Sequence, residues 1–404
     1  MEQIIQHRTD TDFYKFTMYQ VAHHFFPDVK VKAKLYCRTP GLKLGQHIEE
    51  IQKQLELASK LRFTSQELNY LSSIRLLRDD ILTELEKDVL NLNSVSIEKT
   101  KNDDLCIEVE DYWEKEIWWE LIILPIVQEC YTSSLPFNRV TAVSNLIRTI
   151  GKFKEYSSKY KFTLSDFGAR RRHSREWHDL VVGAYKNCLP GVFVGTSDVY
   201  FAMKYGVTPI GTFAHEMYQA ISGTCSNLDE VIPRSLDCWV KEYRGDLGIA
   251  LTDIYGLNVF LKSFDMYYSK LYDGVRHDSG DPILWGNMML QHYKNNKVDP
   301  KNKSFVFSNG IDPMSEECES ILSNFWDKAK VGLGIGTKIT NDVGVTPANI
   351  VVKIVESNGR PTCKIPDGEG KHIGDEDYVQ QVKDHFNYRP ISQDDLTILK
   401  LGGK

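Results

Sequence analysis

The stretch FTLSDFGARRRHS, from Phe162 to Ser174, joins a short apolar run to a polar turn that is rich in arginine. The same succession of an apolar run, a polar or glycine-rich turn and a helical segment recurs along the rest of the chain. The later turns lie in VFVGTSD, VTPIGTFAHE, GIALTDIYG, YDGVRHDSGDP, SFVFSNGID and KVGLGIGTKITND. Their spacing of roughly 15 to 40 residues is typical of successive strand–helix units. The sequence therefore predicts a sheet of parallel strands.

Parallel strands that are connected by crossover helices are buried on both faces, so polar chemistry gathers at their carboxyl ends. Six or seven such units within about 190 residues favour a (β/α) barrel over an open, doubly wound sheet. Periodicity alone leaves both arrangements open. We expect an α/β fold whose main domain, residues 136–348, is an irregular (β/α) barrel.

The regions on either side of this pattern predict a second domain. Residues 1–135 mix helical patterns with strand-like runs such as KVKAKLYCR, and we interpret them as an N-terminal mixed α/β domain. One helix is expected to begin at TSQE, where Thr64 and Glu67 form a capping box. Residues 349–404 begin with an expected strand pair around Asn358-Gly359, and we predict that this C-terminal segment packs on the N-terminal domain.

Charge and composition restrict the partners that the chain can have. The net charge is −6, from 49 basic and 55 acidic residues, and no large basic block is present. A nucleic-acid partner is therefore not expected. No apolar run approaches the roughly 18 residues of a membrane span, and the first residues do not form a secretion signal, so we predict a cytoplasmic protein. Eight scattered cysteines without a C-x-x-C pair predict reduced thiols and no structural metal.

Two of the expected turns suit the binding of a phosphate. GLGIGTK, from Gly332 to Lys338, combines three glycines with a threonine at a position where backbone N–H groups can converge on an anion. It lacks the spacing of a Walker loop, and a flexible turn explains it equally well in isolation. FSNGID, from Phe307 to Asp312, is a weaker pattern of the same kind.

A third turn, DGVRHDSGDP, concentrates acids, an arginine and a histidine within ten residues. Asp278 and Asp281 are candidates for binding the hydroxyl groups of a sugar or a phosphate-bound Mg²⁺. Arg276 offers a two-pronged donor to phosphate oxygens. An acidic surface turn rarely carries both charges this densely, so we favour a functional interpretation.

The turn that opens this section and the one around His215 complete the candidate site. DFGARRR places arginines, which match a carboxylate, beside the ring of Phe167, which can stack on a flat ligand. We expect Arg172 to be solvated. His215 lies at a strand end, where a neutral imidazole can act as a nucleophile, and Asp253 is expected to orient the ring by accepting from its other nitrogen.

These motifs together resemble the nicotinate phosphoribosyltransferase family of NAD salvage. The resemblance covers most of the chain and eight segments in order: TDTDFYKFTMYQ, DFGARRRHS, GTSDVYFA, PIGTFAHE, ALTDIYG, DGVRHDSGDP, FSNGID and GIGTKITND. It implies that nicotinate and 5-phosphoribosyl-1-pyrophosphate are converted to nicotinate mononucleotide and pyrophosphate, with ATP hydrolysis coupled to the reaction. ATP and Mg²⁺ are the implied cofactors. His215 matches the histidine that is transiently phosphorylated in this family.

The resemblance also implies roles for individual residues. Tyr14 and Phe167 would enclose the pyridine ring, and Tyr14 would come from the second subunit of a homodimer. Arg170 would hold the nicotinate carboxylate, with Arg171 nearby. The ribose and its phosphates would be bound by the residues of the remaining motifs, namely Ser197, Arg276, Asp278, Ser308, Asn309, Gly310, Gly336 and Thr337.

Other functions stay open at this level. The arginines of GARRR favour a carboxylate substrate, but a nicotinamide or quinolinate phosphoribosyltransferase is an alternative. A different class is a catalytically silent barrel that only binds a ligand. The presence of His215, Arg276, Asp278 and the GIGT turn argues against such a loss of activity.

Overall fold

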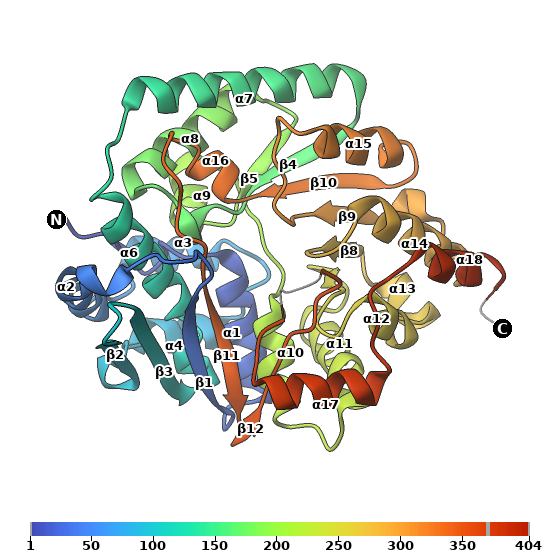
Figure 1. Cartoon of the computed structure of the whole chain (residues 1–404), viewed down its shortest axis with the longest axis horizontal. Helices are drawn as coiled ribbons and strands as arrows, with labels where there is room; N and C mark the ends of the chain where they lie inside the picture. The colour runs from blue at the N-terminus through green and yellow to red at the C-terminus, as the bar shows by residue number, and fades with distance from the viewer. Residues whose placement is uncertain (1, 369–371, 403–404) are drawn as a thin grey trace. The chain divides into compact units, whose positions relative to one another are not determined.

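The computed structural model of the chain describes residues 2–368 and 372–402 (Figure 1). The chain forms two compact units, and it passes between them several times. The first unit comprises Met1–Lys154, Leu164–Gly211 and Ile335–Ile354, and the second comprises Glu155–Thr163, Thr212–Gly334 and Val355–Lys404. The domain bounds that the sequence suggests, at residues 135 and 348, stay predictions.

Antiparallel strands and helices dominate the early part of the first unit. The run KVKAKLYCR forms β1 (Lys30–Cys37), as predicted, and its alternate residues Val31, Ala33 and Leu35 are buried. Strand β3 (Leu105–Tyr112) pairs with β1 on one side and with β2 (Val95–Lys99) on the other. The helices of this region are α1 (Phe13–Phe25), α2 (Ile48–Ser59), α3 (Ser65–Ser72), α4 (Asp79–Lys87), α5 (Trp113–Glu116), α6 (Glu120–Thr132) and the start of α7 (Arg139–Lys159).

Two local predictions from turn and cap chemistry are confirmed. Thr64 caps α3 and forms the expected capping box, in which Glu67 Oε2 accepts from the backbone N–H of Thr64 at 2.8 Å. Asn358 and Gly359, with φ angles of 49° and 74°, connect β11 (Ile350–Ser357) to β12 (Arg360–Pro361). These two strands complete a five-stranded sheet in the order β12-β11-β1-β3-β2.

Each of the seven predicted strand ends follows a strand in the structure. These strands are β4 (Phe162–Asp166), β5 (Phe193–Thr196), β6 (Thr208–Pro209), β7 (Ile249–Leu251), β8 (Gly274–His277), β9 (Ser304–Phe307) and β10 (Lys330–Ile335). They belong to one sheet in the order β6-β5-β4-β10-β9-β8-β7, and the pairs β4–β5, β7–β8, β8–β9 and β9–β10 are parallel. The predicted α/β fold on a parallel, barrel-type sheet is confirmed, with β6 and β7 as the edges among the described strands.

Helices follow these strands, as the alternating pattern predicts (Figure 1). They are α8 (Arg175–Cys188), α9 (Val199–Tyr205), α10 (His215–Ser222), α11 (Val231–Tyr243), α12 (Leu257–Ser263), α13 (Met266–Leu271), α14 (Pro282–Asn295), α15 (Glu316–Phe325) and α16 (Thr337–Thr340). Two further helices, α17 (Glu376–Phe386) and α18 (Gln393–Lys400), come after β12. Helix α9 ends where Gly206 adopts the left-handed conformation, with φ of 61°, which a residue with a Cβ rarely tolerates.

An aromatic core fixes the strands that bear the polar residues of the second unit. Trp285 of α14 packs edge-on against Phe305 and Phe307 of β9, with ring centroids 5.5 and 5.4 Å apart. Gly286 leaves room for Phe325, because a Cβ at Gly286 would lie 2.3 Å from that ring. Burial of such large side chains supplies most of the free energy that holds a strand in place.

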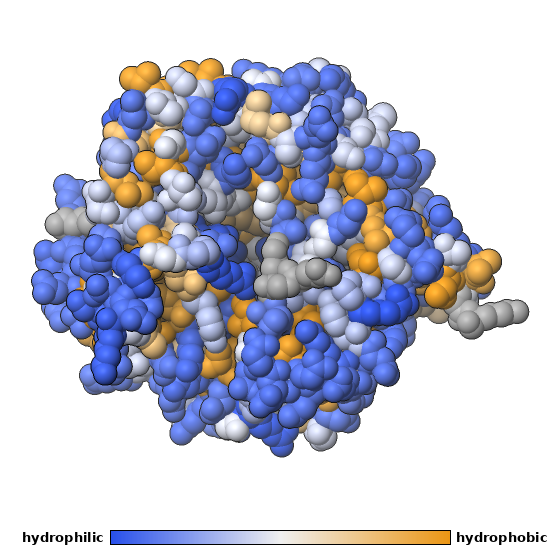
Figure 2. All heavy atoms as spheres, viewed as in Figure 1, coloured by the Kyte–Doolittle hydropathy of each residue, from blue (hydrophilic) through white to orange (hydrophobic). Residues whose placement is uncertain are grey.

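The view in Figure 2 shows a mainly hydrophilic surface on which apolar residues are scattered. Among the helices of the described residues, none combines the length and the hydropathy that crossing a bilayer would require. All eight cysteines are free thiols, as predicted.

Candidate active site

His215 is the first residue of α10, and its imidazole is held by a buried carboxylate of the same unit. His215 Nε2 lies 2.7 Å from Oδ1 of Asp253, which follows strand β7. The second oxygen of Asp253 accepts from Oγ of Ser279 at 2.7 Å. Both carboxylate oxygens of Asp253, which is 1% exposed, are therefore hydrogen-bonded, and they fix the orientation of the His215 ring. The predicted pairing of His215 with Asp253 is present.

Lys364 lies in the middle of the acidic residues around His215. Its Nζ is 3.0 Å from Oδ2 of Asp253 and 3.2 Å from Oδ2 of Asp278. The same oxygen of Asp278 is 4.0 Å from Nδ1 of His215. Sequence reasoning missed this lysine, because a single lysine in CKIPD, beyond the last strand–helix unit, carries no motif that distinguishes it from a surface residue.

Five of the residues predicted to bind the ribose and its phosphates lie at the ends of β8 and β9. Arg276 of β8 donates from Nε to Oγ of Ser308 at 2.7 Å and from Nη2 to Oδ1 of Asp278 at 3.3 Å. Asn309 and Gly310 follow in the same turn, and Gly310 has a φ of 62°. The side chains of Arg276, Asp278 and Ser308 form one polar cluster.

Asp281, a second acid of DGVRHDSGDP, has a local structural role. Its Oδ1 accepts from the backbone N–H groups of Ile283 and Leu284, at 2.8 and 2.9 Å. It is the N-cap of α14, and the suggestion that it also binds a sugar or a metal ion stays a prediction.

The charges around His215 keep the imidazole neutral and the acids ionised. Burial, aided by the positive charge of Lys364, lowers the pKa of His215 below its ordinary value. Burial alone would raise the pKa of Asp278, but Lys364 and Arg276 outweigh it, and the pKa is lowered. Lys364 stays protonated, because the two carboxylates raise its pKa in spite of its burial.

His215, Asp253 and Asp278 also form the arrangement of a three-ligand metal site, with candidate ligand atoms within 4.8 Å of one another. The positions of their neighbours do not fit a resident metal ion. The ammonium group of Lys364 contacts both carboxylates, and Asp253 is already bonded to His215 and Ser279. A divalent cation there would face the lysine charge at close range. The described residues therefore hold a lysine, and not a metal, as the counterion of these acids.

A second group of predicted residues lies in the first unit. Arg170, in the turn after β4, has its guanidinium carbon 5.8 Å from the centre of the Tyr14 ring. Its Nε is 3.6 Å from Oδ2 of Asp12, and its Nη1 is 3.7 Å from Oε1 of Glu120. Tyr14 donates its hydroxyl to Oε2 of Glu120 at 3.1 Å. Tyr14 and Arg170 of the same chain are thus adjacent without a second subunit.

Glu120 is the centre of this group, and sequence reasoning missed it. Its Oε2 is 2.9 Å from Nζ of Lys15, and its Oε1 is 3.7 Å from Nζ of Lys353. Burial would raise the pKa of Glu120, but Lys15, Lys353 and Arg170 lower it. The signal that could have found it is an acid within the apolar run WWELIILP, because a charge in such a run needs a partner.

Ser197 and Gly336 lie in turns next to the group of Tyr14, Arg170 and Glu120. Ser197 Oγ donates to Oδ1 of Asp12 at 2.5 Å. Phe167 donates its backbone N–H to the carbonyl of Ile335 at 2.9 Å, and a Cβ on Gly336 would lie 3.0 Å from the carbonyl oxygen of Phe167. Thr337, which begins α16, follows directly.

The other two arginines of GARRR point to different partners. Arg171 donates to Oδ1 of Asn349 at 2.9 Å. Arg172 is fully buried and donates to Oε1 of Glu129 at 2.7 Å, so the expectation that it is solvated was wrong. The sequence of the turn could not reveal Glu129, which comes from α6, about forty residues earlier.

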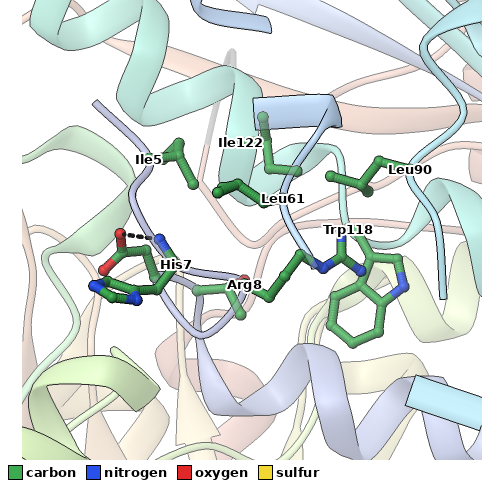
Figure 3. Close-up of a pocket in the computed structure, with 9 residues that line it drawn as sticks. Ile5, His7, Arg8, Leu61, Leu90, Trp118 and Ile122 are labelled. Atoms are coloured by element: carbon green, nitrogen blue, oxygen red, sulfur yellow. Dashed lines mark hydrogen bonds between the residues drawn. The ribbon is translucent and has the colours of Figure 1, made fainter. Parts of the chain in front are cut away.

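A cavity in the first unit is lined by residues that are not among the predicted site residues (Figure 3). Figure 3 shows Arg8 reaching toward the ring of Trp118, below the apolar side chains of Leu61, Leu90 and Ile122. Arg8 pairs with Asp88, and its guanidinium carbon lies 5.3 Å from the centre of the Trp118 ring. We interpret this cavity as part of the packing around a buried ion pair.

Over almost its whole length, the chain is similar to a known protein family and to known proteins. Residues 162–390 match the model of the nicotinate phosphoribosyltransferase (NAPRTase) family, and residues 9–128 match that of its N-terminal domain. The chain is similar to the nicotinate phosphoribosyltransferase of Burkholderia mallei (39% identity over 97% of this chain and 99% of the relative). That of Xylella fastidiosa is 37% identical over 95% of this chain and 98% of the relative.

Solved structures agree with the sequence comparisons. The crystal structure of nicotinate phosphoribosyltransferase from Vibrio cholerae is 30% identical and superposes with a TM-score of 0.90, over 98% of this chain and 96% of that one. The structure from Porphyromonas gingivalis is 28% identical and has a TM-score of 0.88, over 95% of this chain and 100% of that one.

Proposed function

The chain belongs to the nicotinate phosphoribosyltransferase family of NAD salvage, and from this premise we propose a reaction coupled to ATP through a phosphohistidine at His215. Nicotinate and 5-phosphoribosyl-1-pyrophosphate give nicotinate mononucleotide and pyrophosphate, while ATP and water give ADP and phosphate. The observation that carries this proposal is the fixed pairing of His215 Nε2 with Asp253.

The pairing with Asp253 determines which nitrogen of His215 reacts. Asp253 accepts a hydrogen bond from the N–H at Nε2, which leaves the lone pair of Nδ1 for attack on the γ-phosphorus of ATP. The Nδ1–phosphorus bond forms as the bond from phosphorus to the β,γ-bridging oxygen breaks, and ADP leaves with the electron pair. Water later attacks this phosphorus, so that the phosphorus–nitrogen bond breaks and phosphate is released. Throughout, Asp253 balances the positive charge that develops on the ring.

The second step joins nicotinate to the sugar. The pyridine nitrogen attacks the anomeric carbon, and the bond from that carbon to pyrophosphate breaks. The pyridine nitrogen already carries a lone pair, so no protein base is needed. Arg276 and Ser308 are suited to binding phosphate oxygens, and Asp278 is suited to binding ribose hydroxyls. The backbone of Asn309 and Gly310 offers further donors.

Residues of the first unit are suited to nicotinate. Arg170 presents a two-pronged donor next to the ring of Tyr14, which fits a carboxylate on a flat heterocycle. Phe167 would pack on the other face of the pyridine ring, with Arg171 and Ser197 nearby. Gly336 and Thr337 would bind phosphate through their backbone. A homodimer that supplies Tyr14 from a second subunit stays a prediction.

ATP and phosphoribosyl pyrophosphate would enter as their magnesium complexes. Mg²⁺ is then part of the substrates, where it screens the phosphate charge.

A product assay tests the proposal. Purified protein is incubated with nicotinate and phosphoribosyl pyrophosphate, with and without ATP, and nicotinate mononucleotide is quantified by chromatography. We expect product in both cases and a higher rate with ATP. Parallel reactions with nicotinamide and quinolinate test the alternative substrates, and a preference for either would overturn the assignment of nicotinate.

The histidine is tested separately. A His215→Ala variant should lose the stimulation by ATP and retain some transfer without ATP. The wild-type protein should take up acid-labile phosphate from γ-labelled ATP. If it takes up none, the phosphohistidine is refuted, and if product is also absent, a silent binding protein becomes the better interpretation.

A further inference from the structure

We propose that Lys364 is a catalytic residue, which binds the phosphoryl group on His215 by exchanging its ion pairs with Asp253 and Asp278 for phosphoryl oxygens. This inference deepens the proposed function and rests on it. The lysine comes from the C-terminal segment, outside every motif that marks the strand–helix units.

The backbone around Lys364 is tied to the elements that carry the histidine site. Ile365 donates its N–H to the carbonyl of Ile254 at 2.8 Å, and Asp367 donates its N–H to Oγ of Ser279 at 3.0 Å. Ser279 is also the residue that bonds Asp253. These bonds place the lysine stem next to the acid pair, so the position of its ammonium group does not depend on the side chain alone.

Burying the ammonium group of Lys364 destabilises the fold unless other groups stabilise its charge. The residue is 8% exposed, and removing an ammonium group from water costs several kcal/mol before its partners are counted. Two carboxylates at 3.0 and 3.2 Å offset that cost. Apolar residues of similar size would fill this space more cheaply if packing were the sole requirement.

Nδ1 of His215 and Nζ of Lys364 both face the same oxygen of Asp278, at 4.0 and 3.2 Å. A phosphoryl group on Nδ1 brings further anionic oxygens toward that carboxylate, and the two would repel each other. Of the two cations on Asp278, Arg276 is also bonded to Ser308. Lys364 carries three donors on a flexible stem, so it can turn to the incoming oxygens and keep its proton.

The charges of the cluster agree with this exchange. Asp253, Asp278, Lys364 and Arg276 sum to zero while His215 is neutral. The transferred phosphoryl group adds negative charge beside Asp278. In this interpretation, Lys364 is paired with the carboxylates before phosphoryl transfer and with the phosphoryl oxygens after it.

Two variants and a control test the proposal. Lys364→Met removes the charge and keeps much of the stem, whereas Lys364→Arg keeps the charge. Lys294→Met, at an exposed position of α14, is the matched control. Two quantities are measured for each protein: the rate of acid-labile phosphate uptake from magnesium γ-labelled ATP, and the rate of nicotinate mononucleotide formation without ATP. Thermal unfolding shows which variants are folded.

If the charge of Lys364 binds the phosphoryl group, its removal should slow phosphate uptake more than it slows the ATP-independent reaction. Phosphate uptake by Lys364→Met should fall about 10-fold or more beyond any loss in the ATP-independent reaction, and Lys364→Arg should recover most of it. Equal losses in the two reactions, or wild-type phosphate uptake by Lys364→Met, would overturn the proposal. If Lys364→Met does not fold, Lys364→Arg decides, because parallel losses there also overturn it.

The outcome separates this inference from the proposed function. A wild-type protein that takes up no phosphate refutes the phosphohistidine and, with it, the role of Lys364. A wild-type protein that takes up phosphate, together with a Lys364→Met variant that does so equally well, refutes Lys364 alone.

Discussion

Nε2 of His215 lies 2.7 Å from Oδ1 of Asp253, and the other oxygen of Asp253 accepts from Ser279 at the same distance. A carboxylate that is engaged at both oxygens fixes the orientation of the imidazole and the position of its proton. In the proposed mechanism, the atom left to react is therefore Nδ1. This relationship makes a lone histidine at the start of a helix into a candidate nucleophile.

The first prediction concerns Asp253. In an Asp253→Asn variant, the amide keeps the shape of the side chain but loses the negative charge that balances the developing positive ring. Phosphate uptake by His215 should fall by roughly 100-fold, which is typical of a lost charged partner in acid–base catalysis. Quench-flow measurements with γ-labelled ATP give the rate.

Asp327→Asn is the control, since Asp327 is exposed and lies in the same unit. It should behave as the wild type does. A wild-type rate in Asp253→Asn would mean that Asp253 only packs against the ring.

The sequence predicts the parallel strands and the residues that follow them, because each strand end carries a local pattern. Arg276, Asp278 and Ser308 come together, since neighbouring parallel strands end at the same edge. Lys364 and Glu120 were not predictable in this way. Each acts through a partner that lies far away in the chain, and no spacing in the sequence records that pairing.

Burial explains the wrong prediction for Arg172. Arg172 belongs to a turn of three arginines that reads as solvated, but Glu129 of α6 pairs with it inside the protein. Asp281 was predicted as a candidate ligand, and the structure adds a role that the sequence analysis did not predict, the N-cap of α14. The identity of a charged residue does not distinguish a structural role from a ligand-binding role. The positions of its partners in the structure are needed to distinguish the two.

The second prediction concerns pH. Burial and the charge of Lys364 lower the pKa of His215 below 6.5. The neutral ring that the proposed mechanism requires therefore persists to lower pH than in a free histidine, and it is lost as the pH falls through the lowered pKa. NMR titration of the imidazole, with His215→Gln as the assignment control, should give a midpoint below 6.5, and Lys364→Met should raise that midpoint. A wild-type midpoint at or above 6.5 would contradict the arrangement of charges.

The third prediction concerns the recognition of nicotinate. Arg170→Lys keeps a positive charge but loses the planar, two-pronged geometry that matches a carboxylate. The KM for nicotinate should rise roughly 10- to 100-fold, which corresponds to one charge-assisted hydrogen bond, while the KM for ATP should stay near the wild-type value. Steady-state kinetics with each substrate varied in turn provide the measurement.

Arg148→Lys, at an exposed position on α7, is the matched control for this prediction and should not alter either constant. An unchanged KM for nicotinate in Arg170→Lys would remove Arg170 from the carboxylate site.

The fourth prediction concerns stability and the buried ion pair of Arg8, whose side chain is drawn in Figure 3. Arg8 is buried, pairs with Asp88, and has its guanidinium carbon 4.8 Å from the centre of the Phe63 ring. Arg8→Met leaves Asp88 buried with Lys115 as its remaining ion-pair partner among the described residues. The free energy of unfolding should fall by about 3–5 kcal/mol, because one partner of a buried pair is lost. Urea denaturation followed by tryptophan fluorescence measures the change.

The companion variant separates the lost charge from the lost packing. Arg8→Met combined with Asp88→Asn removes the uncompensated carboxylate, while Lys115, whose side chain is 37% exposed, can turn to water. The double variant should therefore be more stable than Arg8→Met alone. Arg148→Met, at a surface position, should change the free energy of unfolding by less than about 0.5 kcal/mol. A double variant that is less stable than Arg8→Met would show that Asp88 stabilises the fold through contacts other than this ion pair.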